Sequence, residues 1–232
     1  QKQKLTDFIY KWLHNKINIV LKSLIDLKDL KDKNSSIKAL SFQLYENNGV
    51  LKRDQVSDYL KILGQNERKV LRDLGVKFGR YHVFLHRLIK PEAVSLRTLL
   101  WKNFLQKHFD LKPPVFGLNF LNDENFNNKN FMLLCGFEKF DNFFVRIDIL
   151  ERLFMQIINS EKEVKIIPEM LNLLGCNKNA FKQLLINMGY KIIEKEKDIF
   201  FKYQPKKDTK KTFNKKTQKE SPFGILKKLS FN

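Results

Sequence analysis

Arginine and lysine side chains at helical spacing are the residues of this sequence best suited to binding a ligand. Arg68 and Arg72 lie four residues apart in a segment, 66–74, whose pattern predicts a helix. Val70, Leu71 and Leu74 would form the buried side, so we expect both arginines to be exposed and replaceable without loss of the fold. A guanidinium group can donate two parallel hydrogen bonds to a phosphate, which favours a polyanionic backbone as ligand. The predicted patch consists of Arg68, Lys69, Arg72, Lys77 and Arg80.

Two further groups of basic residues lie downstream. Lys178, Lys182 and Lys191 have no acidic neighbour between Glu169 and Glu194. Residues 111–203 nevertheless carry 13 basic and 12 acidic groups, so this group is the weaker candidate. Residues 204–232 carry 9 basic and 2 acidic groups. We predict nucleic-acid binding by four tail residues, Lys206, Lys207, Lys210 and Lys211. We predict partner docking by a terminal apolar motif, Phe223, Ile225, Leu226 and Leu229.

Motifs for catalysis are absent from the sequence. It contains no GxxxxGK[ST] phosphate loop and no GxSxG, HExxH or CxxC pattern. His82 and His86 flank a predicted strand, where four-residue spacing gives no shared helical face for a metal. Asp148 and Glu151 are interpreted as a helix capping box and not as paired catalytic carboxylates. We therefore predict no catalytic residue, metal or cofactor in this chain.

The net charge of +19 favours a polyanionic partner. No apolar run approaches the roughly 20 residues that span a bilayer, so we expect no membrane contact. The two cysteines lie apart from each other and from the histidines, which favours a reducing compartment. We predict a cytoplasmic location.

The elements that position the basic residues are mostly helical. The spacing predicts one long helix over 5–30, helices over 53–63 and 66–74, and a strand over 76–85, bent at Gly79. Strands are expected over 131–137 and 143–147. Residues 166–203 follow the order helix, turn, helix and two-stranded wing, which is that of a winged helix-turn-helix. Residues 36–85 show a looser version of that order.

The predicted fold class is mainly α with short β hairpins. It comprises a helical region, a winged helix-turn-helix-like unit and a disordered basic tail. The predicted divisions are a long helix (1–33), a helical nucleic-acid-binding unit with a strand or wing (34–110), a linker or loop (111–130), a winged-helix-like unit (131–203) and the lysine-rich tail (204–232).

Six segments of the chain form a further pattern. They are Leu71–Gly79, His82–Leu85, Leu88–Pro91, Val145–Arg152, Met188–Tyr190 and Ser221–Leu226. In order and spacing these segments resemble the C-terminal region of bacterial superfamily-two DExH helicases related to the mitochondrial degradosome RNA helicase. The resemblance covers most of the chain from about residue 5. His86 departs from it, because a proline is expected there. The family's ATP-binding and unwinding motifs are absent from this chain.

The resemblance implies that the parent protein is an ATP-dependent helicase, with RNA the favoured substrate. ATP and Mg²⁺ would belong to motor domains upstream, and a nuclease is a possible partner. We therefore expect an accessory region that holds single-stranded RNA or DNA through phosphate contacts. Two alternatives stay open. One is a free-standing winged-helix DNA-binding protein, and the other is a scaffold that docks a nuclease partner.

Overall fold

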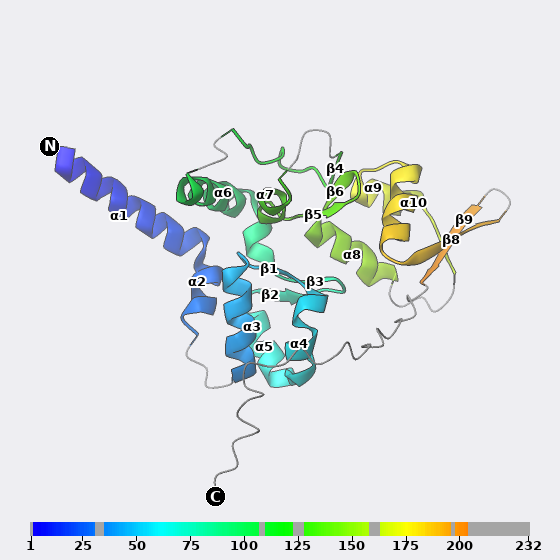
Figure 1. Cartoon of the computed structure of the whole chain (residues 1–232), viewed down its shortest axis with the longest axis horizontal. Helices are drawn as coiled ribbons and strands as arrows, with labels where there is room; N and C mark the ends of the chain where they lie inside the picture. The colour runs from blue at the N-terminus through cyan, green and yellow to red at the C-terminus, as the bar shows by residue number, and fades with distance from the viewer. Residues whose placement is uncertain are drawn as a thin grey trace, which may run out of the picture.

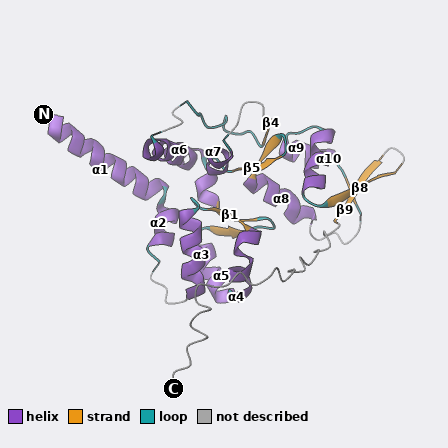
Figure 2. Ribbon diagram, in the orientation of Figure 1, coloured by secondary structure: helices purple, strands orange, loops and turns teal. Residues whose placement is uncertain are grey.

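The computed structural model describes residues 2–30, 35–106, 110–122, 128–157, 163–195 and 198–203. Helices dominate this part of the chain, and the strands are short and antiparallel (Figures 1 and 2). The predicted mainly α class with short β hairpins is confirmed. The tail that was predicted to be disordered lies outside the described residues. Within these ranges, no helix has both the length and the apolar character needed to cross a membrane.

The N-terminal segment forms two helices, α1 (Lys2–Val20) and α2 (Lys22–Lys28). The prediction of one helix over 5–30 is wrong, because the backbone leaves the helical conformation at Leu21 (φ −100°, ψ 17°). Leu21 is buried in the core beneath the junction, which favours a change of direction there. Helix α1 projects away from the body of the molecule (Figure 1) and buries none of its residues.

The first unit of the fold is a small antiparallel sheet with three helices against it. Its sheet has the order β1-β3-β2. The strand predicted over 76–85 is instead two strands, which form a hairpin that turns at residues 79–81. The elements are α3 (Ser35–Glu46), β1 (Val50–Lys52), the 3-10 turn η1 (Arg53–Val56), α4 (Ser57–Ile62), α5 (Gln65–Asp73), β2 (Val76–Phe78) and β3 (His82–Leu85).

The third unit repeats this arrangement, and its sheet has the corresponding order β7-β9-β8. Both helices and the hairpin predicted over 166–203 are confirmed, and a third strand, β7, joins them. Asn177 caps the second of these helices, because its side chain accepts a hydrogen bond from the Ala180 amide at 2.8 Å. The elements are α8 (Ile147–Ile157), β7 (Val164–Lys165), α9 (Pro168–Leu174), α10 (Lys178–Asn187), β8 (Tyr190–Lys195) and β9 (Asp198–Tyr203).

A middle unit connects the other two, and its sheet has the order β4-β6-β5. The strand predicted over 131–137 is wrong, since residues 129–134 form a helix. Asn128 caps this helix by accepting a hydrogen bond from the Phe131 amide at 2.9 Å. The elements are the 3-10 turn η2 (His86–Ile89), α6 (Pro91–Leu105), β4 (Phe120–Asn122), α7 (Lys129–Leu134), β5 (Phe137–Phe140) and β6 (Phe143–Arg146).

The same turn leads from helix to hairpin in all three units. Gly75, Gly136 and Gly189 end α5, α7 and α10 with φ values of +94°, +87° and +85°. Each glycine amide donates a hydrogen bond to the carbonyl three residues earlier, at 2.8 to 3.0 Å. A left-handed residue at this position reverses the chain, and glycine adopts it without steric cost. The three units therefore share both sheet order and turn geometry, although the middle unit has one helix where the other two have two.

The carboxylate of Glu151 fastens the third unit to the first. It accepts hydrogen bonds from the backbone amides of Arg80, Tyr81 (2.9 Å) and His82 (2.7 Å) in the β2–β3 turn. The capping box predicted for Asp148 and Glu151 is therefore wrong. Asp148 instead pairs with Arg146, at 2.7 Å from its Nε. A Cβ atom on Gly79 would overlap the Glu151 carboxyl carbon, so this close approach requires glycine.

His82 extends the contact into a buried charge cluster that contains residues of all three units. Its Nδ1 lies 3.0 Å from Glu151 Oε1, and its Nε2 lies 3.3 Å from Glu138 Oε2 on β5. Lys52 of β1 pairs with the other Glu138 oxygen at 2.6 Å. His82, Glu138 and Glu151 are each at most 5% exposed. Buried carboxylates are tolerated only with such partners, so the cluster fixes how the units are docked.

The pKa values of two cluster members are shifted in opposite directions. Burial alone lowers the pKa of His82, but hydrogen bonds to Glu138 and Glu151 outweigh it and raise the pKa above 6.5. Burial alone raises the pKa of Glu138, but hydrogen bonds to His82 and Lys52 lower it below 4.5. Both shifts favour the charged pair in the folded state.

Arg97 on α6 makes a second buried connection, between the first and middle units. It is 4% exposed and donates hydrogen bonds to the carbonyls of Asn48 (2.7 Å), Leu88 (2.6 Å) and Leu134 (2.8 Å). Burial lowers the pKa of Arg97 to about 10, which leaves it charged at neutral pH. Three carbonyl dipoles from three segments thus take the place of a counter-ion.

We predict that Glu151→Gln lowers the free energy of unfolding by about 3–5 kcal/mol, because it leaves buried donors without a carboxylate. Gly79→Ala should also destabilise the fold, by displacing the same carboxylate. In Glu151→Ala the clash is absent, so adding Gly79→Ala should then cost much less. Urea denaturation of wild type, Gly79→Ala, Glu151→Ala and the double variant measures the coupling energy between the two residues. Additive losses would contradict the proposed contact, and the exposed neighbour Arg152→Ala is the control.

The stability of the protein should also depend on pH. The contribution of His82, whose pKa is raised, is complete below pH 6.5 and is lost as the pH rises through the folded-state value. The contribution of Glu138, whose pKa is lowered, is present above pH 4.5 and is lost as the pH falls through its folded-state value. We expect these two groups to contribute most to stability at pH values between the folded-state pKa of Glu138 and that of His82. In His82→Gln the loss of stability at rising pH should be smaller than in wild type. In His14→Gln this loss should be the same as in wild type. Wild-type stability that rises above pH 6.5 would be inconsistent with this assignment.

Candidate nucleic-acid interface

Arg68 does not project freely from α5 as predicted. Its Nη2 donates to the Leu60 carbonyl at 2.7 Å and its Nε to the Leu63 carbonyl at 3.2 Å. These carbonyls lie at the C-terminal end of α4, where a positive charge satisfies unpaired acceptors. Val70, expected to be buried, is 36% exposed, whereas Leu71 is fully buried. The arginine is thus partly structural.

Phe78 on β2 brings the two arginines of α5 together. The guanidinium carbons of Arg68 and Arg72 lie 6.0 and 5.8 Å from the centre of its ring. Arginine over an aromatic face is attracted electrostatically and is held in a defined orientation. The side chain of Arg72 is exposed. The phenylalanine thereby fixes a cation at the surface.

Arg80, in the β2–β3 turn, also lies over an aromatic ring, which here belongs to a residue of the third unit. Its guanidinium carbon lies 5.4 Å from the ring centre of Tyr203 on β9, and Tyr203 is 44% exposed. Tyr203 also lies against Tyr190, its cross-strand partner, with ring centres 5.2 Å apart. We call Arg68, Arg72, Phe78, Arg80 and Tyr203 the arginine–aromatic strip. The sequence did not predict the role of either aromatic residue.

The other residues of the first predicted patch lie at different places. Lys69 is exposed on α5. Lys77 alternates with Phe78 along β2 and therefore points to the other face of the hairpin. On that face, burial lowers the pKa of His86, and the positive charges of Lys90 and Lys77 lower it further. His86 thus lies in a second positive region, close to Lys77 and Lys90.

The lysines predicted in the third unit do not form one patch. Lys178 is exposed at the start of α10, while Lys182 forms an ion pair with Glu194 at 2.6 Å. Lys191 is exposed on β8, directly opposite Lys202 on β9. The remaining predicted residues lie outside the described part of the chain. They are Lys206, Lys207, Lys210, Lys211, Phe223, Ile225, Leu226 and Leu229.

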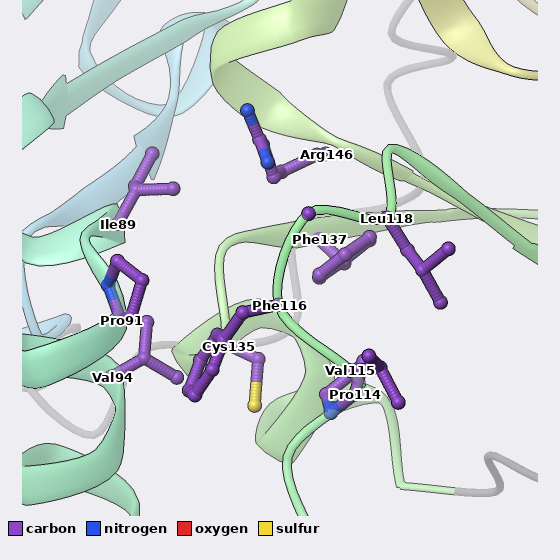
Figure 3. Close-up of a pocket in the computed structure, with 11 residues that line it drawn as sticks. Ile89, Pro91, Val94, Pro114, Val115, Phe116, Leu118, Cys135, Phe137 and Arg146 are labelled. Atoms are coloured by element: carbon purple, nitrogen blue, oxygen red, sulfur yellow. The ribbon is translucent and has the colours of Figure 1, made fainter.

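A small pocket lies elsewhere, between α6 and the segment 114–118 (Figure 3). Apolar side chains such as Val94, Phe116 and Phe137 line most of it, and Arg146 lies at one side, paired with Asp148. Burial raises the pKa of Cys135 in this pocket to about 12, so its thiol stays protonated at neutral pH. The pocket combines no activated nucleophile with a base.

Comparison with protein-family models, with curated proteins and with solved structures finds no match. The functional argument therefore depends on the residues of this chain. Among them, the arginine–aromatic strip is the one described surface that combines clustered guanidinium groups with partly exposed aromatic rings.

We predict that Arg68→Ala and Arg72→Ala differ in stability. Arg68→Ala should lower the free energy of unfolding by about 1–3 kcal/mol, because two backbone acceptors lose a charged donor. Arg72→Ala should stay within about 0.5 kcal/mol of wild type, as is usual for exposed residues. Urea denaturation measures both, and this outcome revises the expectation that both arginines can be replaced freely. Equal stability of the two variants would show that the Arg68 hydrogen bonds contribute little.

Proposed function

We propose that this chain is the nucleic-acid-binding accessory region of an ATP-dependent helicase and holds single-stranded RNA or DNA beside the motor. The arginine–aromatic strip is the observation that carries the proposal. The helicase parent follows from the sequence resemblance, in which the ATP and Mg²⁺ sites belong to motor domains outside this chain. In this proposal the chain binds and positions a strand and performs no reaction itself.

The strip offers both interactions that a single strand requires. Arg72 and Arg80 are exposed, and neither has a carboxylate partner among the described residues. Their guanidinium groups can therefore contact phosphates. Phe78 and Tyr203 present rings beside them, and bases stack on such rings with little sequence preference. A flexible strand can satisfy both interactions, whereas the bases of a duplex are already stacked.

The element order supports a winged-helix interpretation of the first and third units. In each, two helices joined by a short turn precede an antiparallel hairpin. In helix-turn-helix proteins the second helix contacts nucleic acid. The corresponding helix of the first unit, α5, carries Arg68 and Arg72. In this interpretation, the strip begins on the helix that would contact nucleic acid.

Lysines of the tail follow the strip closely in the chain. Lys206 is three residues beyond Tyr203 in the sequence. Residues 204–232 carry 9 basic and 2 acidic groups. We include this excess as a second, less specific source of phosphate contacts.

Binding to fluorescent single-stranded RNA and DNA, measured by anisotropy at several salt concentrations, tests the proposal. With about 6–10 phosphate contacts, the affinity should fall by roughly 10³–10⁵ between 50 and 200 mM salt. Arg72→Ala/Arg80→Ala should weaken binding and reduce the salt slope by about two, one for each lost contact. A duplex of the same sequence should bind more weakly than the single strand.

Two controls separate the strip from net charge. Lys38→Ala/Lys112→Ala removes the same charge at exposed sites outside the strip and should leave affinity nearly unchanged. Lys206→Ala/Lys207→Ala/Lys210→Ala/Lys211→Ala removes twice as much charge from the tail. If the tail variant loses affinity while the Arg72/Arg80 variant binds normally, the strip is not the binding element. Absence of any binding would favour the scaffold alternative.

A further inference from the structure

The sheet of the third unit has one face on the core and one face toward solvent. Phe201 and Ile199 of β9 are buried, and Ile192 of β8 packs beside them. Side chains alternate along a strand, so Phe200 and Lys202 of β9 must lie on the opposite face. The β8–β9 hairpin extends from the edge of the molecule, beyond α10 (Figure 1). We call the solvent side the outer sheet face.

The strand register places an aromatic ring among lysines on this face. Phe200 lies opposite Ile193 on one side and opposite Lys165 on the other. In the next row, Lys202 lies opposite Lys191. On the other side of Phe200 along the strand, Lys195 lies opposite Asp198. The Nζ of Lys195 is 5.3 Å from the centre of the Phe200 ring. Four lysines thus surround one ring.

The four lysines differ in their acidic partners. Lys165 pairs with Asp198 at 2.6 Å, and Lys195 pairs with Glu163. Lys191 and Lys202 are exposed, and neither makes an ion pair among the described residues. Like charges directly opposite each other destabilise an antiparallel pair. The nearby carboxylate of Glu163, whose pKa the charge of Lys202 lowers, offsets part of this repulsion, and an anion between the two ammonium groups would offset more of it.

We infer that the outer sheet face is a second contact surface for single-stranded nucleic acid. Lys191 and Lys202 bind one or more phosphates there, and Phe200 provides a stacking platform for a base. Lysines that track the backbone beside an aromatic ring, here the half-buried Phe200, are the combination by which single strands are bound without sequence preference. The inference deepens the proposed function and rests on it for the class of ligand.

This face adjoins the arginine–aromatic strip at the end of β9. Lys202 directly precedes Tyr203, whose ring carries Arg80. A strand bound along the strip reaches the outer face by passing the end of β9. Short oligonucleotides should therefore occupy the strip alone, and longer ones should contact both surfaces. Site sizes of roughly 4–16 nucleotides in single-strand-binding folds give the lengths to compare.

The test uses Lys191→Thr/Lys202→Thr in the full chain, with oligonucleotides of about 4 and about 16 nucleotides. Threonine suits a strand and removes the repulsion, so the melting temperature should be equal to or above that of wild type. Affinity for the longer oligonucleotide should fall at least about tenfold, with a salt slope reduced by about two. Affinity for the shorter one should stay unchanged. A variant that binds the longer strand as wild type does would overturn the inference.

A second measurement needs no variant. RNA and DNA of the longer length that carry 4-thio-substituted bases are cross-linked to the wild-type protein by light, and the modified peptides are identified. Cross-links at Lys191, Phe200 or Lys202 support the second surface, and their absence while Phe78 or Tyr203 is cross-linked contradicts it. Phe200→Leu keeps an apolar residue in the sheet and should lower affinity for the longer strand about fivefold or more.

The outcomes separate this inference from the proposed function. If Arg72→Ala/Arg80→Ala binds weakly and Lys191→Thr/Lys202→Thr binds normally, the proposed function stands and the second surface fails. If only the lysine variant loses affinity, the outer sheet face binds and the strip does not. If the wild-type chain binds neither RNA nor DNA, both fail.

Discussion

The architecture depends on one carboxylate that reaches across the molecule to a backbone turn. Glu151 belongs to the third unit, yet it satisfies three successive amides of the first unit. His82 bridges this carboxylate and that of Glu138, so the middle unit is tied to it as well. The proposed interface is a consequence, because Arg80 and Tyr203 come from different units and meet only when these are docked. A contact between residues 71 positions apart in sequence thus brings together the two halves of the proposed interface.

Local signals predicted the parts of the fold that local chemistry determines. The helices and hairpin of 168–203 were predictable because Pro168, Gly175 and Gly189 mark their ends. The segment 131–137 was mistaken for a strand because its apolar run has no clear period, although Asn128 offered a helix cap. Glu151 was mistaken for a capping residue because spacing alone cannot reveal a partner in another unit. The recurrence of a glycine between helix and hairpin was the available signal for three related units.

The candidate site was predictable in residue type more than in geometry. Arginines on α5 were identified from their spacing, but Arg68 proved to hold the end of α4. Lys77 was grouped with them, although strand alternation turns it to the other face. Phe78 and Tyr203 were missed because an aromatic residue in a strand is usually explained by the core. Their role depends on which face the fold leaves open.

The central claim is that the guanidinium groups beside Phe78 and Tyr203 contact the nucleic-acid backbone. The most direct measurement follows the arginine side-chain Nε–H signals by NMR while single-stranded RNA is added to the wild-type chain. The account predicts saturable shifts for Arg72 and Arg80 that reverse at high salt, with little change for the buried Arg97. Binding that shifts neither Arg72 nor Arg80 would contradict it.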